Sequence, residues 1–157
     1  MFQPLGFERC PVNTSLGRMI YYTTTGSPLQ DEMTTITAKE TIVFLHGFGG
    51  GSSAYERSKV YSAFAAEYHI IAPDLIGWGE SEHPERNYQV EDYLTTIEEF
   101  LQQTCEGAVK VIASSLTAAF TIRVAISHPE LFKSLILTTP AGLSDFGENY
   151  SRSFFAQ

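Results

Sequence analysis

Two apolar segments meet in the stretch Val109-Lys110-Val111-Ile112-Ala113-Ser114-Ser115-Leu116-Thr117. The first segment is short and nearly continuous, which is typical of a strand buried on both faces of a parallel sheet. The second continues through residues 116–127 and predicts a central helix, which ends at His128-Pro129 because proline cannot extend a helix. The stretch therefore predicts a strand that turns directly into a helix, with a pair of serines at the turn.

Ser115 occupies the position of a nucleophile elbow, a sharp strand-to-helix turn that holds a reactive side chain outward. Such a turn accepts only small groups two residues before and after the nucleophile, because those positions pack against neighbouring backbone. For Ser115 they are Ala113 and Thr117, whereas for Ser114 both would be bulky aliphatic residues. Serine is also common at ordinary turns and helix caps, so the assignment depends on two further motifs upstream.

The first of these is a glycine-rich loop, His46-Gly47-Phe48-Gly49-Gly50-Gly51, which directly follows the predicted strand 41–45. Glycines let the main chain approach a ligand without a Cβ in the way. A nucleotide site is disfavoured, because the loop lacks the final glycine of the dinucleotide fingerprint and no Gly-Lys-Ser/Thr follows. The loop therefore favours backbone N–H groups directed at a small substrate.

The second motif, Asp74-Leu75-Ile76-Gly77-Trp78-Gly79-Glu80-Ser81, follows the predicted strand 69–73. Each of the three motifs leaves the end of an apolar strand, and their order along the chain resembles that of the α/β-hydrolase superfamily. In that family the elbow is usually Gly-x-Ser-x-Gly, and here Ala113 and Thr117 replace the two glycines. The resemblance implies a doubly wound, mostly parallel sheet, with ligands bound beyond the carboxyl ends of the strands.

The resemblance also implies roles for individual residues. Ser115 would be the catalytic nucleophile, and the backbone N–H groups of Phe48 and Leu116 would form the oxyanion hole. Asp74 would brace its turn and would not be the catalytic acid. The residues expected to brace the loops are His46, Gly47, Gly49 and Asp74.

A serine nucleophile needs a histidine base and an orienting carboxylate, and in this family both follow the serine along the chain. The histidine that follows here, His128, lies at the far end of the predicted helix, about 18 Å from the elbow at 1.5 Å per residue. His46, His69 and His83 precede the serine and are better explained as structural or solvated side chains. No carboxylate follows the last predicted strand before Asp145. We therefore expect the acid and the histidine beyond residue 157, and the chain to be truncated before the last strands of the fold.

The predicted elements alternate between strands and helices, as in an α/β domain. A hairpin is expected to pair strands 7–12 and 18–25, and 34–39 is expected to be a loop. Residues 1–143 would form the N-terminal part of the core and 144–157 the start of a cap. The other strands are expected at 42–45, 69–72, 109–113 and 134–138, and the helices at 58–66, 90–104 and 116–127.

Composition narrows the classes of partner. Ten Lys and Arg against eighteen Asp and Glu give a formal net charge of −8, which disfavours nucleic acid and anionic membrane surfaces. Cys10 and Cys105 have no metal-ligand or redox spacing, so no metal and no cofactor are expected. Without a secretory signal or a spanning segment in the sequence, a cytoplasmic protein with a small-molecule substrate is expected.

Two classes of function stay open. The first is hydrolysis of an ester or a related small acyl or carbonyl compound through Ser115 and an acyl-enzyme; these 157 residues alone would then be inactive. A serine at the elbow disfavours the dehalogenase and epoxide-hydrolase branches, whereas haloperoxidase-like or lyase chemistry remains possible. The alternative is a non-catalytic fragment, a pseudoenzyme or a subunit that needs a partner chain.

The predicted last strand, 134–138, would be an unpaired apolar edge. The tail adds four aromatic side chains near helical spacing, at Phe146, Tyr150, Phe154 and Phe155. Exposed apolar edges favour pairing with another chain. We therefore expect self-association or a partner chain at this edge.

Overall fold

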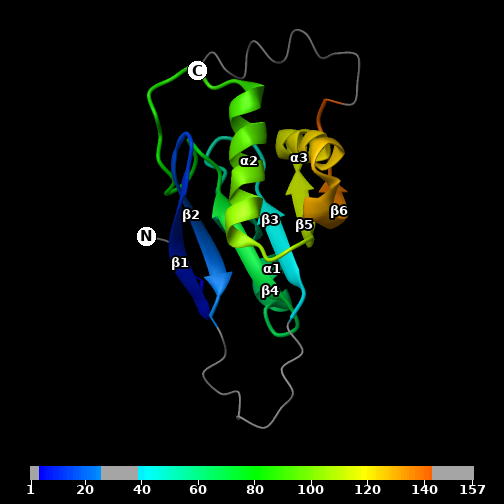
Figure 1. The fold of residues 1–157 in the computed structure, drawn as a ribbon. Helices are drawn as coiled ribbons and strands as arrows, with labels where there is room; N and C mark the ends of the chain where they lie inside the picture. Colours follow the sequence, from blue (N-terminus) through cyan, green and yellow to red (C-terminus); the bar gives the residue numbers. More distant parts are fainter. Residues whose placement is uncertain (1–3, 26–38, 143–157) are drawn as a thin grey trace.

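The structure is a computed structural model in which residues 4–25 and 39–142 are described. Within these residues one sheet has six strands in the order β1-β2-β4-β3-β5-β6 (Figure 1). The strands are β1 Phe7–Thr14, β2 Gly17–Thr24, β3 Thr41–Leu45, β4 His69–Asp74, β5 Val109–Ser114 and β6 Phe132–Thr138. The helices are α1 Ser58–Phe64, α2 Val90–Thr104 and α3 Ser115–Ser127, with short 3-10 helices η1 Ala54–Arg57 and η2 Pro129–Leu131.

Strands β1 and β2 form the predicted hairpin at one edge of the sheet. They are antiparallel, with Thr14 opposite Gly17 beside the turn. Gly17 has φ 136°, a conformation that residues with a Cβ rarely adopt. Strand β2 also pairs antiparallel with β4, through Ile20 opposite Asp74 and three further residue pairs. The hairpin therefore joins the parallel part of the sheet on the β4 side.

Strands β4, β3, β5 and β6 are parallel. Val43 of β3 lies opposite Ile71 of β4 on one side and Val111 of β5 on the other, and all three side chains are buried. Because the central strands are covered on both faces, their residues are apolar almost without interruption. The predicted doubly wound, mostly parallel α/β sheet is confirmed.

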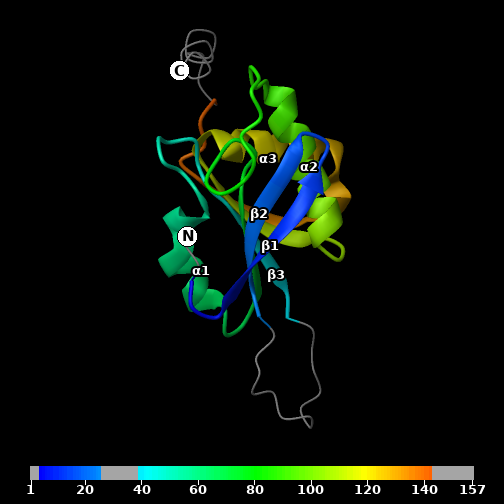
Figure 2. The same ribbon diagram turned by 90° about the vertical axis from the view of Figure 1, so that its left-hand side faces the viewer.

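Helices cover both faces of this sheet. Helix α1 lies on one face and α2 and α3 lie on the other (Figure 2). Tyr61 of α1 is fully buried in a cluster with Phe44 and Ile70. On the opposite face, Phe100 of α2 and Val124 of α3 belong to a larger core cluster. The carboxyl ends of β3, β4 and β5 lead into the three motifs found in the sequence.

Most predicted boundaries agree with the structure to within two residues. Helix α1 ends at Phe64 rather than at 66, α3 already begins at Ser115, and β6 begins at Phe132, two residues before its predicted start. The predicted cap region 144–157 and the predicted loop 34–39, apart from its last residue, lie outside the described residues. Across the ranges 4–25 and 39–142, no helix is both long and apolar enough to cross a bilayer.

Candidate active site

Ser115 lies at the junction of β5 and α3, and its backbone conformation differs from that of both elements. Its φ is 55°, in the left-handed region that a residue with a Cβ seldom occupies, whereas the preceding Ser114 is extended with φ −125°. Such a conformation costs about 1–3 kcal/mol and is concentrated at functional sites. A sharp strand-to-helix turn with the serine at its apex is the geometry expected of a nucleophile elbow.

The glycine-rich loop lies directly against this elbow. A methyl group added at Gly47 would lie 3.4 Å from Cβ of Ser115 and 3.5 Å from Oγ of Ser114. These are ordinary van der Waals distances, so residue 47 lies in direct contact with the elbow. The fold thus brings together two of the motifs that are more than sixty residues apart in the sequence.

Two hydrogen bonds orient the backbone of Gly47. The buried ring of His46 donates from Nδ1 to the Gly47 carbonyl oxygen at 2.7 Å, and its Nε2 accepts the N–H of Leu75 at 3.0 Å. The peptide bond between Gly47 and Phe48 is planar and trans, so its N–H points away from its carbonyl group. By holding the carbonyl oxygen, His46 therefore also fixes the direction of the Phe48 N–H.

The same histidine ring is neutral in the folded protein. Burial lowers the pKa of His46 below its ordinary value, and the hydrogen bond to Gly47 and the nearby acidic side chains only partly oppose this shift. A ring that accepts a hydrogen bond at Nε2 cannot carry a proton there. His46 therefore links the loop after β3 to the loop after β4 as a neutral imidazole, and neither of its nitrogens is available as a base.

Asp74 makes a second link between loops. Its carboxylate accepts the N–H of Ala54 at 2.6 Å and the N–H of Glu80 at 2.8 Å, and its backbone carbonyl accepts the hydroxyl of Ser81 at 2.6 Å. Asp74 is buried, and a methyl group at Gly79 would overlap its carboxylate. These are contacts of a residue that braces a turn, and they occupy both oxygens of the carboxylate.

The side chain of Phe48 is buried in a group of aromatic rings, which we call the aromatic cluster. Its ring centroid lies 5.0 Å from that of Trp78, 4.7 Å from Tyr93 and 5.4 Å from Phe120, each in an edge-on arrangement. Tyr93 stacks on Phe120 and on the fifth member, Tyr88. Edge-on and offset-stacked pairs are the favoured aromatic geometries. The cluster therefore holds the Phe48 side chain on the core side of the loop.

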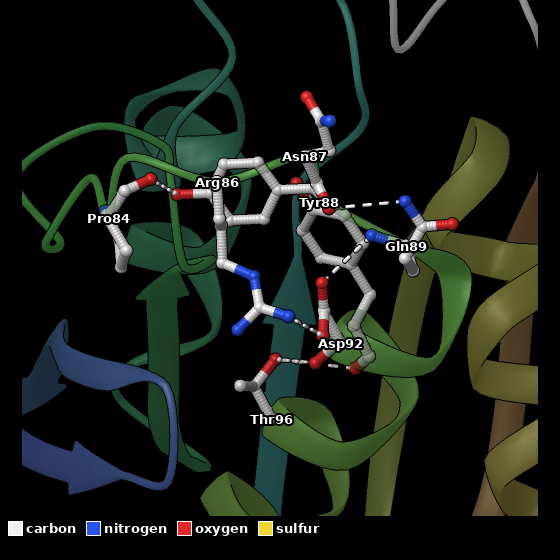
Figure 3. A network of polar contacts seen from close by, with 8 residues as sticks. Pro84, Arg86, Asn87, Tyr88, Gln89, Asp92 and Thr96 are labelled. Carbon is white, nitrogen blue, oxygen red and sulfur yellow. Dashed lines mark hydrogen bonds and ion pairs between the residues drawn. The ribbon is translucent and has the colours of Figure 1, made fainter.

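A polar network supports the aromatic cluster at the start of α2 (Figure 3). The carboxylate of Asp92 accepts the N–H of Gln89 at 2.8 Å and pairs with the guanidinium of Arg86 at 2.9 Å. The Tyr88 hydroxyl donates to the carbonyl of Pro84 at 3.2 Å. This network fixes the chain that enters α2 and carries Tyr88 against Tyr93.

The amide of Leu116, the second predicted oxyanion-hole donor, lies in the first turn of α3. N–H groups in the first turn of a helix have no acceptor within the helix, and the helix dipole places partial positive charge there. Ser115 and Leu116 are both partly exposed. The segment after β6 returns to this point, since Ala141 donates its N–H to the Ser115 carbonyl at 3.1 Å.

Sequence reasoning missed Glu56, which lies in η1 beside the elbow. Its Oε2 accepts the Gly47 N–H at 3.0 Å, and its Oε1 accepts the Ser52 hydroxyl at 3.2 Å. A signal was present, because Ser53 and Glu56 have the spacing of a helix capping box. Ser53 does cap η1, but Glu56 reaches back to the glycine-rich loop.

The three other histidines of the chain are bonded elsewhere. His69, at the start of β4, contacts the hydroxyls of Thr23 and Thr24, and burial lowers its pKa. His83 donates to the carbonyl of Gly79, and His128 lies between two glutamates at the far end of α3. None of these contacts involves the elbow.

Thr117 lies two residues after Ser115, at a position where the predicted elbow calls for a small group. Its side chain is fully buried, its Oγ1 has no hydrogen-bond partner among the described residues, and its carbonyl accepts the hydroxyl of Thr121 at 2.7 Å. The turn thus accommodates a β-branched residue by burying it within the first turn of α3. In the described part of the chain, no group of three or more His, Cys, Asp or Glu side chains could hold a metal ion.

Comparison with known proteins agrees with this architecture. The family model of the alpha/beta hydrolase fold matches residues 40–154. Lipase 1 of Psychrobacter immobilis is 33% identical over 112 residues, which cover 70% of this chain and 34% of the lipase. A 2-hydroxy-6-oxo-6-(2'-aminophenyl)hexa-2,4-dienoic acid hydrolase of Metapseudomonas resinovorans is 26% identical over 106 residues, 66% of this chain and 37% of that enzyme.

Among solved structures, a serine hydrolase involved in carbazole degradation superposes with a TM-score of 0.75 at 22% identity. The match covers 89% of this chain and 50% of that protein. The chain belongs to the α/β-hydrolase fold family, as the three motifs predicted. It spans about a third of the length of the two curated relatives named above.

Proposed function

We propose that the protein is a serine hydrolase that cleaves an ester or a related small acyl or carbonyl compound through an acyl-enzyme on Ser115. The observation that carries this proposal is the left-handed backbone of Ser115, which stands at a strand-to-helix turn against Gly47. The relatives support the same reaction class, since one is named a lipase and another a hydrolase of a dienoic acid.

In the proposed reaction, Oγ of Ser115 attacks the carbonyl carbon of the substrate while a base takes the hydroxyl proton. The carbonyl oxygen becomes an oxyanion, which accepts hydrogen bonds from the N–H groups of Phe48 and Leu116. The tetrahedral intermediate collapses, the C–O bond to the leaving group breaks, and the leaving alcohol receives the proton. Water then attacks the acyl-enzyme in the same way and releases the acid.

We place the histidine base of this proposal and its orienting carboxylate outside these 157 residues. All four histidines of the chain have the contacts described above, and the carboxylate of Asp74 is bonded on both oxygens. What the described residues supply in this proposal is the nucleophile, its turn and the oxyanion donors. Haloperoxidase-like or lyase chemistry would use the same scaffold.

Labelling with a fluorophosphonate probe tests the proposal. The probe is applied to the chain joined to the remaining strands of a relative, which supply the histidine base and the acid. We expect a covalent adduct on Ser115, located by peptide mass spectrometry, that disappears in Ser115→Ala and in the urea-unfolded protein. Ser114→Ala is the matched control, because Ser114 is extended and should leave labelling intact. An adduct that survives Ser115→Ala would contradict the assignment of the nucleophile.

A second candidate, a non-catalytic subunit or pseudoenzyme, is favoured by two observations. The buried Oγ1 of Thr117, two residues after Ser115, has no hydrogen-bond partner among the described residues, and no histidine of the chain contacts Ser115 in the described structure. The same probe separates the two candidates. If the folded chain, joined to the remaining strands of a relative, labels no faster than the unfolded chain, the non-catalytic role is favoured.

A further inference from the structure

We propose that Glu56 is a positioning residue that holds the glycine-rich loop in the shape in which the Phe48 N–H faces Ser115. This inference rests on the proposed function, because it assigns Glu56 a part in building the oxyanion hole. It concerns a residue outside the three motifs, on the short helix η1 that follows the loop.

The carboxylate of Glu56 bridges two points of the loop. Oε2 accepts the Gly47 N–H at 3.0 Å and Oε1 accepts the Ser52 hydroxyl at 3.2 Å. Ser52 is itself buried and donates its N–H to the carbonyl of Gly49 at 2.9 Å. One side chain therefore fixes the first and the last part of the loop, with Phe48 between them.

Gly47 needs such a restraint because glycine has the widest backbone freedom of any residue. His46 holds the carbonyl side of Gly47 at 2.7 Å, and Glu56 holds the N–H side at 3.0 Å. With both sides bonded, the peptide planes before and after Gly47 are fixed. The plane after Gly47 carries the Phe48 N–H, so its direction depends on both restraints. Without Glu56, only the carbonyl side of Gly47 would be held by a hydrogen bond, the one from His46.

The position of η1 makes this contact possible. Ala54 of η1 donates its N–H to Asp74, and Arg57 donates to the hydroxyl of Thr138 in β6 at 2.8 Å. The helix is thus tied to the ends of β4 and β6, and Glu56 extends from this support to the end of β3. The ionisable groups nearest to Glu56 are His46, whose pKa Glu56 raises through its charge, and Arg57, its neighbour in η1.

Amide hydrogen exchange measured by NMR tests the hydrogen bond directly. An N–H that donates to a side chain exchanges more slowly than one that does not, so the Gly47 amide should exchange about fivefold faster in Glu56→Ala than in the native chain. In Glu56→Gln the slow exchange should be kept, and the Ala54 and Glu80 amides, which are bonded to Asp74, should exchange at the native rate in both variants. A Gly47 amide that exchanges equally fast in the native chain and in Glu56→Ala would overturn the proposal.

The effect on Ser115 is measured as the rate of fluorophosphonate labelling of the chain joined to the remaining strands of a relative. We expect Glu56→Ala to lower the rate by about fivefold, the equivalent of one ordinary hydrogen bond, and to lower the melting temperature by no more than about 4 °C. Glu56→Gln should restore the rate to within about twofold, because its amide oxygen can accept the Gly47 N–H and its amino group can donate to Ser52. The matched control is Glu67→Gln, an exposed glutamate outside the loop.

The outcomes separate the two proposals. If neither the native chain joined to the remaining strands nor any of its variants labels, the proposed function fails, and the Gly47 hydrogen exchange alone decides the role of Glu56. If the native chain labels and Glu56→Ala labels equally fast, the positioning role is wrong and the function stands. If Glu56→Gln is as slow as Glu56→Ala, charge rather than hydrogen-bond geometry acts on Ser115, which also contradicts the inference.

Discussion

At the scale of single residues, two glycines show how closely the loops of the site pack. A Cβ at Gly47 would lie 3.4 Å from Cβ of Ser115, an ordinary contact, whereas a Cβ at Gly79 would overlap the carboxylate of Asp74. Gly79 also has a φ of 53°, in the left-handed region that favours glycine. The loops around the elbow are thus shaped by close backbone approach as much as by hydrogen bonds.

We predict that Gly79→Ala destabilises the protein by about 2–4 kcal/mol, because the new methyl group displaces Asp74 and strains the backbone. The measurement is the free energy of unfolding in urea. Gly50→Ala is the matched control, since its Cβ would meet nothing within 4 Å and its φ is not positive. That variant should stay within about 0.5 kcal/mol of the native chain. Equal stability of the two variants would show that the Asp74 contacts do not support the fold.

A second residue-scale prediction concerns pH. Burial lowers the pKa of His46 from 6.5, so below pH 6.5 the unfolded chain binds a proton that the folded chain excludes. Stability is therefore complete above pH 6.5 and falls as the pH drops toward the folded pKa, by at most about 1.4 kcal/mol per pH unit for one histidine. His69 adds a loss of the same sign, because burial also lowers its pKa.

Urea unfolding at pH 7.5 and pH 5.5 measures this effect. The difference in stability between the two pH values should shrink most in His46→Gln and less in His69→Asn, because His69 is only half-buried. The low pKa of Glu40, about 2, which its hydrogen bonds to Lys110 and Lys133 cause, acts only below this window. If His46→Gln keeps the full difference, the imidazole is not the group that titrates.

At the scale of elements, the beginning of α2 determines how the aromatic cluster meets the loop. Asp92 accepts the N–H of Gln89, and Gln89 in return accepts the N–H of Asp92, which together form a capping box. Arg86 binds the other oxygen of the Asp92 carboxylate (Figure 3). The helix therefore starts at a fixed residue, and Tyr93 follows one position later.

We predict that Asp92→Ala lowers the free energy of unfolding by about 1–2 kcal/mol, since it removes a helix cap and a partly buried ion pair. Arg86→Gln should cost less than about 1 kcal/mol, because Arg86 is exposed and surface ion pairs contribute little. Glu91→Ala, beside Asp92 but exposed and 3.7 Å from Arg123, is the control. A loss as large in Glu91→Ala as in Asp92→Ala would mean that the capping box is not the cause.

The elements themselves could be predicted from the sequence because their signals are local. The apolar runs of β3, β4 and β5, the periodicity of α2 and the His-Pro stop after α3 each depend on a few neighbouring residues. The elbow was recognisable for the same reason, since Ser115 needs small groups only two residues away. The strand order was not, because it depends on contacts between segments far apart in the chain.

The contacts of Glu56 and Arg86 show why the rest of the site could not be predicted. The spacing of Ser53 and Glu56 suggests a capping box at the start of η1. The Glu56 side chain instead accepts the N–H of Gly47, nine residues earlier. Arg86 lies in an irregular segment, where no periodicity gives the direction of a side chain. Which acceptor such a side chain meets is decided only when the loops pack together.

At the scale of the whole molecule, the two edges of the sheet differ. The β1 edge is a twisted hairpin strand with alternating exposure, as is usual for a protected edge. The β6 edge pairs with β5 on one side and, within the described residues, with no strand on the other. Ile136 of β6 is 54% exposed. An apolar edge with free N–H and carbonyl groups is a template for pairing with another strand.

We therefore predict that the 157-residue chain associates through β6 as its concentration rises, and that Ile136→Lys shifts the association to higher concentration by about tenfold, because a charge at an edge opposes pairing. Sedimentation velocity over a hundredfold range of concentration measures this. Ile126→Lys is the matched control, because Ile126 is 76% exposed but lies on helix α3 and not on the edge strand β6. If the two lysine substitutions have equal effects, the association depends on general surface hydrophobicity and not on the β6 edge. A monomer at every concentration, with a sharp and reversible melt, would show that the β6 edge is already protected in the chain as it stands.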